Sequence, residues 1–247
     1  GGLSIVSAAQ DTNSANTVVL TTSAQTLGAT YTVTVNSITD RFNNAIASNS
    51  VISVKSRITI DGSFDDWAGV PLAFTDPEDS TESTDYKDVY VTSDDNYIYM
   101  RVTLYSPSDF AIFYNNIFID ADNKPASGFA ILGTLSEMLL QGGSGYQEKN
   151  GAFNEGGIDG LDWAIAPTGV GTDFEFRFSR KATYAADRRP VFSGDTFAFL
   201  LESENTGFVT RDTAPDSGGF AYTFPASTQL GPLAIVSTQG QVTISWS

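Results

Sequence analysis

Hydrophobic and polar residues alternate along most of the chain with a period of two, which is typical of half-buried β-strands. The segments with the clearest alternation are 31–35, 97–104, 174–178, 197–201 and 220–224. Clusters of Gly, Asn, Asp and Ser separate them, for example at 93–96, 122–125 and 142–145. Many short strands divided by frequent turns predict an all-β fold with a β-sandwich, and argue against a parallel α/β fold.

Six other segments complete this prediction. Short strands are expected at 18–20 and 51–54, and a terminal hairpin is expected at 233–246. The only segments with a helical character are 134–140 and 180–186, and both are short. The glycine-rich segment 141–163 reads as a long irregular stretch.

Charge divides the chain into three parts. Residues 58–226 carry 27 of the 29 acidic side chains and 10 of the 13 basic ones, whereas residues 227–247 carry no charged side chain. We therefore expect a central domain at 58–226, between a β-segment at 1–57 and a hairpin at 227–247. Each terminal segment is too short for a complete sandwich, so it must pair with the central domain, with the other end or with a neighbouring chain.

Composition excludes several kinds of chemistry. The chain has no histidine and no cysteine, which excludes His- and Cys-based catalysis, disulfides, and metal sites made of those side chains. A net charge of −16 argues against nucleic acid as a partner, and no apolar run reaches the roughly 20 residues of a membrane span. Low lysine content and a first residue other than methionine favour a processed segment of an extracellular or cell-surface protein.

A D-x-D-N turn follows the apolar strand predicted at 116–119. Asp120, Asp122 and Asn123 place two carboxylates and an amide oxygen in one tight turn. Calcium binds six to eight hard oxygens, so this turn is a candidate calcium site. The alternative is an Asx turn, in which the carboxylates accept hydrogen bonds from nearby backbone N–H groups.

The densest acidic region is 61–95, with 11 acids and one base, Lys87. A second calcium ion held by some of Asp79, Asp85 and Asp88 would relieve the repulsion within it. The alternative is a solvated loop screened by salt. The Asp-Asp-Asn at 94–96 is predicted to form a hairpin turn.

Aromatic residues are the other candidates for ligand binding. Tyr146, Trp163 and Tyr184 could stack on the C–H face of a sugar ring, although Trp163 also fits an inward-facing strand position. Trp67 is interpreted as a core residue. Paired acids such as those at 159/162 and 202/204 could in principle serve a glycosidase, but dense acids on a β-protein indicate solvation or cation binding, and we expect no enzymatic activity.

Several short motifs follow one another in the central domain: "IDGSFDDW" at 60–67, "VYVTSDDNYIYMRV" at 89–102, "NIFIDADNKPASGF" at 116–129, and the strands at 173–180 and 193–203. Their order resembles the family 9-like carbohydrate-binding modules. The resemblance implies a jelly-roll-like sandwich, often with bound calcium and frequently attached to polysaccharide-degrading enzymes. The segment before it resembles the C-terminal half of a bacterial Ig-like domain, through Gly28, Tyr31, Val33, Val35 and Asp40. The last segment, 233–246, resembles the opening hairpin of another Ig-like or fibronectin-like domain.

Two hypotheses follow for function. The first is a non-catalytic extracellular carbohydrate-binding module that is stabilised by calcium and has a polysaccharide as its partner. The second is a structural subunit of a surface layer, adhesin or extracellular filament, which self-associates by exchanging strands of its terminal Ig-like segments.

Overall fold

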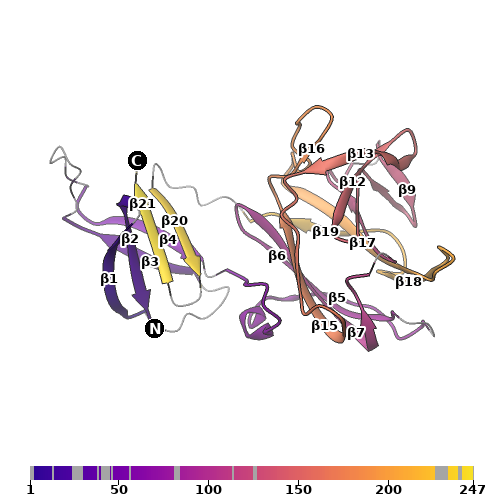
Figure 1. Cartoon of the computed structure of the whole chain (residues 1–247), viewed down its shortest axis with the longest axis horizontal. Coiled ribbons are helices and arrows are strands. Elements are labelled where there is room, and N and C mark those ends of the chain that lie inside the picture. The colour runs from indigo at the N-terminus through magenta and orange to yellow at the C-terminus, as the bar shows by residue number, and fades with distance from the viewer. Residues whose placement is uncertain are drawn as a thin grey trace. The chain divides into compact units, whose positions relative to one another are not determined.

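The structure is a computed structural model that describes residues 3–12, 14–23, 30–37, 39, 45, 47–55, 57–80, 84–112, 114–124, 127–225, 233–238 and 241–246. The chain forms two compact units, which Figure 1 shows as ribbons. Unit 1 contains residues 1–59, 64–69 and 226–247, and unit 2 contains residues 60–63 and 70–225. Gly28 and Asp40 of the Ig-like motif lie outside the described residues.

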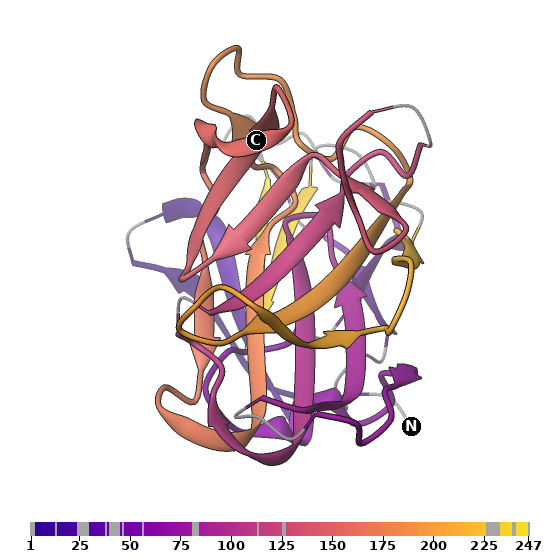
Figure 2. The same ribbon diagram turned by 90° about the vertical axis from the view of Figure 1, so that its right-hand side faces the viewer.

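Unit 2 consists of two large antiparallel sheets and a small hairpin (Figures 1 and 2). The five-stranded sheet has the order β14-β15-β7-β6-β5, with bounds Ala164–Ala166 (β14), Val170–Ser179 (β15), Tyr97–Asp109 (β7), Tyr86–Ser93 (β6) and Leu72–Thr75 (β5). The eight-stranded sheet has the order β16-β13-β12-β11-β8-β17-β18, with bounds Thr183–Tyr184 (β16), Ala152–Asp159 (β13), Ser144–Lys149 (β12), Met138–Gln141 (β11), Asn115–Asp120 (β8), Thr196–Glu204 (β17) and Thr210–Ala214 (β18). Its eighth strand, β19 (Phe220–Thr223), also pairs with β17.

The main core of unit 2 contains residues from both sheets. Phe174, Phe176 and Phe178 alternate along β15 and are fully buried, because the period of two directs all three to one face. Phe197 and Phe199 of β17 belong to the same buried cluster, although β17 is in the other sheet. The prediction of an all-β sandwich is therefore confirmed.

The eight-stranded sheet also buries part of its outer face. Every residue of β8 is buried, and its apolar residues Ile117, Phe118 and Ile119 follow one another without a polar residue between them. Phe118 points away from the main core and forms a second cluster with Leu139 and Leu200. Phe129 and Ile131 pack against this cluster from the hairpin of β9 (Phe129–Ile131) and β10 (Thr134–Ser136).

Three sequence-based expectations about local structure were wrong. Residues 134–140 form strands β10 and β11 instead of a helical turn, and 180–186 contain the short strand β16. Met138 and Leu140 of β11 enter the main core while Leu139 enters the outer cluster, so burial on both faces obscured the period of two. The glycine-rich segment contains the paired strands β12 and β13, and Gly156 lies opposite Gln147, where an added Cβ would be 2.8 Å from the Gln147 Cβ.

Two turn motifs have clear structural partners. The "IDG" motif donates the N–H groups of Asp61 and Gly62 to Oε1 of Glu175, at 2.9 and 2.7 Å. Asp94 accepts the N–H groups of Asn96 and Tyr97 at 2.7 and 2.9 Å, which confirms the predicted hairpin turn between β6 and β7.

Unit 1 brings the two ends of the chain together. Its four-stranded sheet has the order β1-β2-β21-β20, with bounds Ile5–Asp11 (β1), Ser14–Thr22 (β2), Gln241–Trp246 (β21) and Leu233–Thr238 (β20). A second pair joins β3 (Thr30–Val35) to β4 (Ser50–Lys55). Of the three pairings left open by the sequence, the structure has the ends paired with each other, through β2 and β21.

The remaining element is a short 3-10 helix, η1 (Phe64–Trp67), in unit 1. Trp67 is buried there, as expected from its interpretation as a core residue. Within the described ranges, no helix has the length and apolar character needed to cross a membrane.

Candidate functional site

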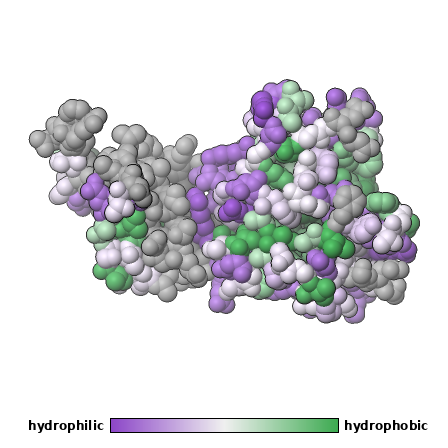
Figure 3. Space-filling view, in the orientation of Figure 1, coloured by the Kyte–Doolittle hydropathy of each residue, from purple (hydrophilic) through white to green (hydrophobic). Residues whose placement is uncertain are grey.

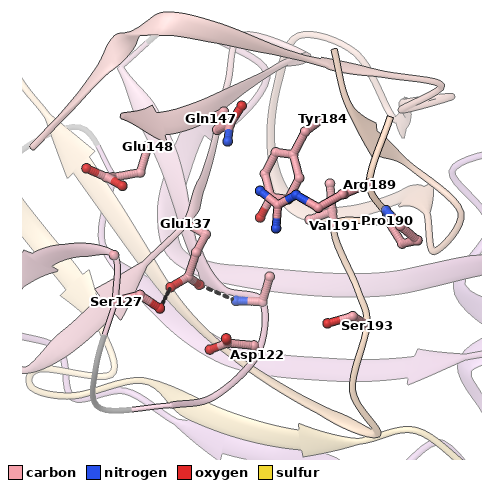
Figure 4. A pocket seen from close by; sticks show the side chains of 12 residues that line it. Asp122, Ser127, Glu137, Gln147, Glu148, Tyr184, Arg189, Pro190, Val191 and Ser193 are labelled. Carbon is pink, nitrogen blue, oxygen red and sulfur yellow. Dashed lines mark hydrogen bonds between the residues drawn. The ribbon is translucent and has the colours of Figure 1, made fainter. Parts of the chain in front are cut away.

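Unit 2 contains a polar cavity of about 230 Å³. Figure 4 shows the side chains of its lining residues, which are Ala121, Asp122, Ser127, Gly128, Glu137, Gln147, Glu148, Tyr184, Arg189, Pro190, Val191 and Ser193. Carboxylates, amide, hydroxyl and guanidinium groups all reach this cavity. Such a lining offers both donors and acceptors to a hydroxyl-rich ligand.

Strand pairing places Glu137 beside the D-x-D-N turn. β11 runs antiparallel to β8, and the N–H of Glu137 donates to the carbonyl of Ile119 at 3.0 Å. The Glu137 carboxylate then accepts the N–H of Ala121 at 2.9 Å and the Ser127 hydroxyl at 3.1 Å, which are the two dashed bonds in Figure 4. Glu137 is thereby fixed at the wall of the cavity.

Gly128 permits the close approach of these segments. It has a φ of +105°, and a Cβ there would be 2.7 Å from the backbone carbon of Leu135. Only glycine fits both the backbone conformation and the space. The β9–β10 hairpin therefore closes against Ser127 and Glu137 because residue 128 has no side chain.

Three carboxylates meet beside the cavity, and two of them, Asp122 and Glu137, line it. Asp120, Asp122 and Glu137 each offer an oxygen, and these oxygens lie within 4.8 Å of one another. Burial, and then the neighbouring Asp120 and Asp122, raise the pKa of Glu137 to about 7, against the lowering effect of the Ala121 and Ser127 hydrogen bonds. Burial also raises the pKa of Asp120. A divalent cation would compensate this concentration of negative charge.

The surroundings of Asp120 bear on both alternatives that the sequence left open, an Asx turn and a cation site. The backbone N–H groups of Asn123, Lys124 and Asp122 lower the pKa of its carboxyl, as neighbouring N–H groups do in an Asx turn. Its Oδ1 is nevertheless buried and has no hydrogen-bond partner. An Asx turn alone therefore leaves one buried oxygen of Asp120 unsatisfied, and a cation would satisfy it.

The other wall of the cavity carries Tyr184 and Arg189. The Arg189 guanidinium lies over the Tyr184 ring, 5.2 Å from its centre, as Figure 4 shows. Nε of Arg189 also donates to Asp187 at 2.7 Å. Tyr184 is buried, and its burial together with the charge of Glu137 raises its pKa to about 12. Tyr184 therefore stays a neutral hydrogen-bonding group over the physiological range of pH.

The structure brings some predicted site residues together and separates others. Asp120 and Asp122 lie in the cluster, whereas Asn123 is an exposed residue with a φ of +48°, and the side chain that completes the cluster is Glu137. Sequence reasoning missed Glu137 because it stands in a segment predicted as a helical turn. The available signal was an isolated acid between two short apolar runs.

The three aromatic candidates have different surroundings. Tyr184 lines the cavity. Trp163 stacks on Phe176, with ring centres 5.1 Å apart, and packs against the main core. Tyr146 is half-buried against the outer cluster around Phe118. These residues form no shared aromatic platform in the described part of unit 2.

The acidic loop before β6 lies elsewhere in unit 2. Asp79 joins Asp76 and Asp212 in a second group of carboxylates whose oxygens lie within 4.8 Å of one another. Asp85 is buried near them and influences the pKa of both Asp76 and Asp212. Asp88 is not in this group, and its Oδ1 accepts the Thr75 hydroxyl at 2.8 Å.

Three of the four acids considered for glycosidase chemistry are engaged in other bonds. Asp159 pairs with Arg188, and Asp162 accepts the Tyr97 hydroxyl. Glu202 is buried, and it accepts hydrogen bonds from Asn116 and Thr210 at 3.0 and 2.6 Å.

Comparison with models of protein families, with curated proteins and with solved structures found no match to this chain. The function is therefore inferred from the cavity and the carboxylates that surround it.

Proposed function

We propose that unit 2 is a non-catalytic carbohydrate-binding module of an extracellular or cell-surface protein, and that its ligand occupies the polar cavity. A calcium ion held by Asp120, Asp122 and Glu137 stabilises the site. The observation that carries this proposal is that Asp122 and Glu137 belong both to the cavity wall and to the carboxylate cluster. A cation at the cluster would therefore lie at the edge of the space that holds the ligand.

The chemistry of the cavity favours a neutral sugar. The hydroxyl groups of such a sugar would donate hydrogen bonds to the carboxylates of Glu137 and Glu148. They would accept hydrogen bonds from the side chains of Gln147 and Arg189. Sulfated or uronic sugars would meet repulsion from these acids unless the cation bridges them. Three carboxylate oxygens leave at least three of the six to eight calcium positions for water or sugar hydroxyls.

The hydrogen bonds made by acids outside the cavity support the non-catalytic role. Asp162 and Glu202 accept hydrogen bonds from Tyr97, and from Asn116 and Thr210, respectively. The acids at the cavity instead converge closely enough to share one cation. Repulsion among them favours cation binding over the separate acid and base roles that glycoside hydrolysis requires.

A glycan array probed with the whole protein in calcium tests the proposal. We expect retention of neutral glycans by the wild type, and loss of retention in Glu137→Gln and in Ser193→Trp, which fills the cavity and leaves every carboxylate in place. Asp95→Asn is the matched control, because it removes one exposed acid in the β6–β7 turn. Retention that is unchanged in both cavity variants would place any sugar site elsewhere and contradict the proposal.

A further inference from the structure

A second group of buried carboxylates lies where the chain between β5 and β6 meets β18. Asp76 directly follows β5, Asp79 lies in the connection, and Asp212 belongs to β18 of the opposite sheet. Their oxygens lie within 4.8 Å of one another. Asp76 and Asp212 are only 2% and 5% exposed. Three acids from distant parts of the sequence therefore converge in a largely buried position.

Two oxygens in this region have no hydrogen-bond partner although they are buried. They are Oδ2 of Asp76 and Oδ1 of Asp85, and the Asp85 side chain is 4% exposed. Buried polar atoms in folded proteins nearly always have a partner, because an unsatisfied one loses its hydration without compensation. These unpaired oxygens indicate that the group is built for a ligand that supplies positive charge.

The surrounding hydrogen bonds position the carboxylates without neutralising them. Asp212 accepts the N–H groups of Tyr86 and Thr213 at 2.6 and 2.8 Å, and the Tyr105 hydroxyl donates to the carbonyl of Asp76 at 3.0 Å. Burial, and then Asp212 and three further carboxylates, raise the pKa of Asp76 to about 8. All five of these influences oppose its charged form, which a bound cation would favour.

We propose that Asp76, Asp79 and Asp212 bind a divalent cation, calcium, which connects the β5–β6 loop to β18 and so links the two sheets of unit 2. Carboxylates are hard ligands, and ligands from two separate segments suit the variable coordination of calcium better than the strict octahedron of magnesium. This site is separate from Asp120, Asp122 and Glu137, and it does not depend on carbohydrate binding. Its role is structural, because the cation joins residues that are far apart in the sequence.

Calcium titration of the Glu137→Gln protein isolates this site, since that background lacks one carboxylate of the cavity cluster. Calorimetry of the whole chain measures the number of ions, and thermal unfolding is followed with and without calcium. The test variants are Asp76→Asn and Asp79→Asn, and Asp95→Asn is again the control. Asp79 is exposed, so its replacement spares the core.

We expect one calcium ion per chain in the Glu137→Gln background, with an affinity on the order of tenfold lower in each test variant. Calcium at a hundred times its dissociation constant should raise the melting temperature by about 5 to 10 °C. Without calcium and above about pH 8, where the Asp76 carboxyl is charged, Asp76→Asn should melt at or above the temperature of its parent, because it removes an uncompensated buried charge. A purely structural role of Asp76 predicts the opposite, a lower melting temperature in both conditions.

Two results would overturn the site. One is the absence of any calcium binding in the Glu137→Gln background while the wild type binds a single ion. The other is destabilisation by Asp76→Asn that is equal with and without calcium. Neither result bears on carbohydrate binding, which the glycan array measures separately.

Discussion

At the residue scale, Glu175 shows how a single buried acid supports a turn in a distant part of the chain. The side chain is fully buried in β15, and its Oε1 accepts two backbone N–H groups of the "IDG" motif. The alternation along β15 predicts an outward, solvent-facing glutamate at this position. The structure instead covers this face with the motif, and the two N–H groups satisfy the carboxylate.

Replacing Glu175 tests this contact. Glu175→Ala leaves two backbone donors without their acceptor, so we expect the free energy of unfolding to fall by about 3 kcal/mol. Glu175→Gln keeps an acceptor oxygen and should lose about 1 kcal/mol. Equilibrium unfolding in urea measures both values, and equal stability of the two variants would contradict the hydrogen-bonding role.

Asp76 and Asp212 make the metal-free protein sensitive to pH. Burial and neighbouring acids raise the pKa of Asp76 from 3.8 to about 8, and burial raises that of Asp212 to about 6. A raised pKa in the folded state means that folding favours the protonated form, so stability is full below pH 4 and is lost as the pH rises through 6 and 8. The acids that face Asp76 are Asp79, Asp85, Asp212 and Asp216.

After removal of divalent cations, we therefore expect the free energy of unfolding to fall by about 3 kcal/mol between pH 5 and pH 8.5. The unfolding free energy of Asp76→Asn should fall less over this interval. In the wild type, saturating calcium should prevent most of the fall. Denaturant unfolding at several pH values measures the effect. Stability that stays constant or increases over this interval in the metal-free wild type would contradict it.

At the scale of elements, the sequence predicts strands well where large apolar residues recur with a period of two, and poorly where that period is lost. The alternation at 97–104, 174–178 and 197–201 corresponds to β7, β15 and β17. Residues 134–140 lose this signal because β11 is buried on both faces, and that error also hid Glu137. The paired acids of the D-x-D-N turn could be predicted, but Glu137, Asp76 and Asp212 come close to their partners only through strand pairing, which spacing in sequence does not encode.

The pairing of β2 with β21 predicts a strong dependence of unit 1 on the backbone of β2. Val19 pairs on one side with Ala9 of β1 and on the other with Thr243 of β21, so Val19→Pro removes a donor from a central strand. Val6 lies at a register irregularity of the edge strand β1, and Val6→Pro is the matched control.

We expect Val19→Pro to abolish the protection of β21 amides in hydrogen exchange while unit 2 stays protected, because unit 2 has its own core. Val6→Pro should leave β21 protected. Protection of β21 that survives Val19→Pro would contradict the pairing of the two chain ends.

At the scale of the whole molecule, almost all of the net charge of −16 belongs to unit 2, which also contains both groups of converging carboxylates. The space-filling view in Figure 3 shows hydrophilic residues interspersed with groups of hydrophobic ones on the face in view. Cation binding at both groups would lower the repulsion within unit 2. The filament hypothesis requires terminal strands that are free to exchange, whereas β2 and β21 pair within one chain.

The most direct measurement for the central claim is a glycan array probed with the wild-type protein twice, once in calcium and once after chelation. The account predicts that neutral glycans are retained in calcium and lost after chelation, because Glu137 and Asp122 serve both the cation and the cavity. An array that retains no glycan in calcium, with the protein folded and saturated with the ion, would contradict it.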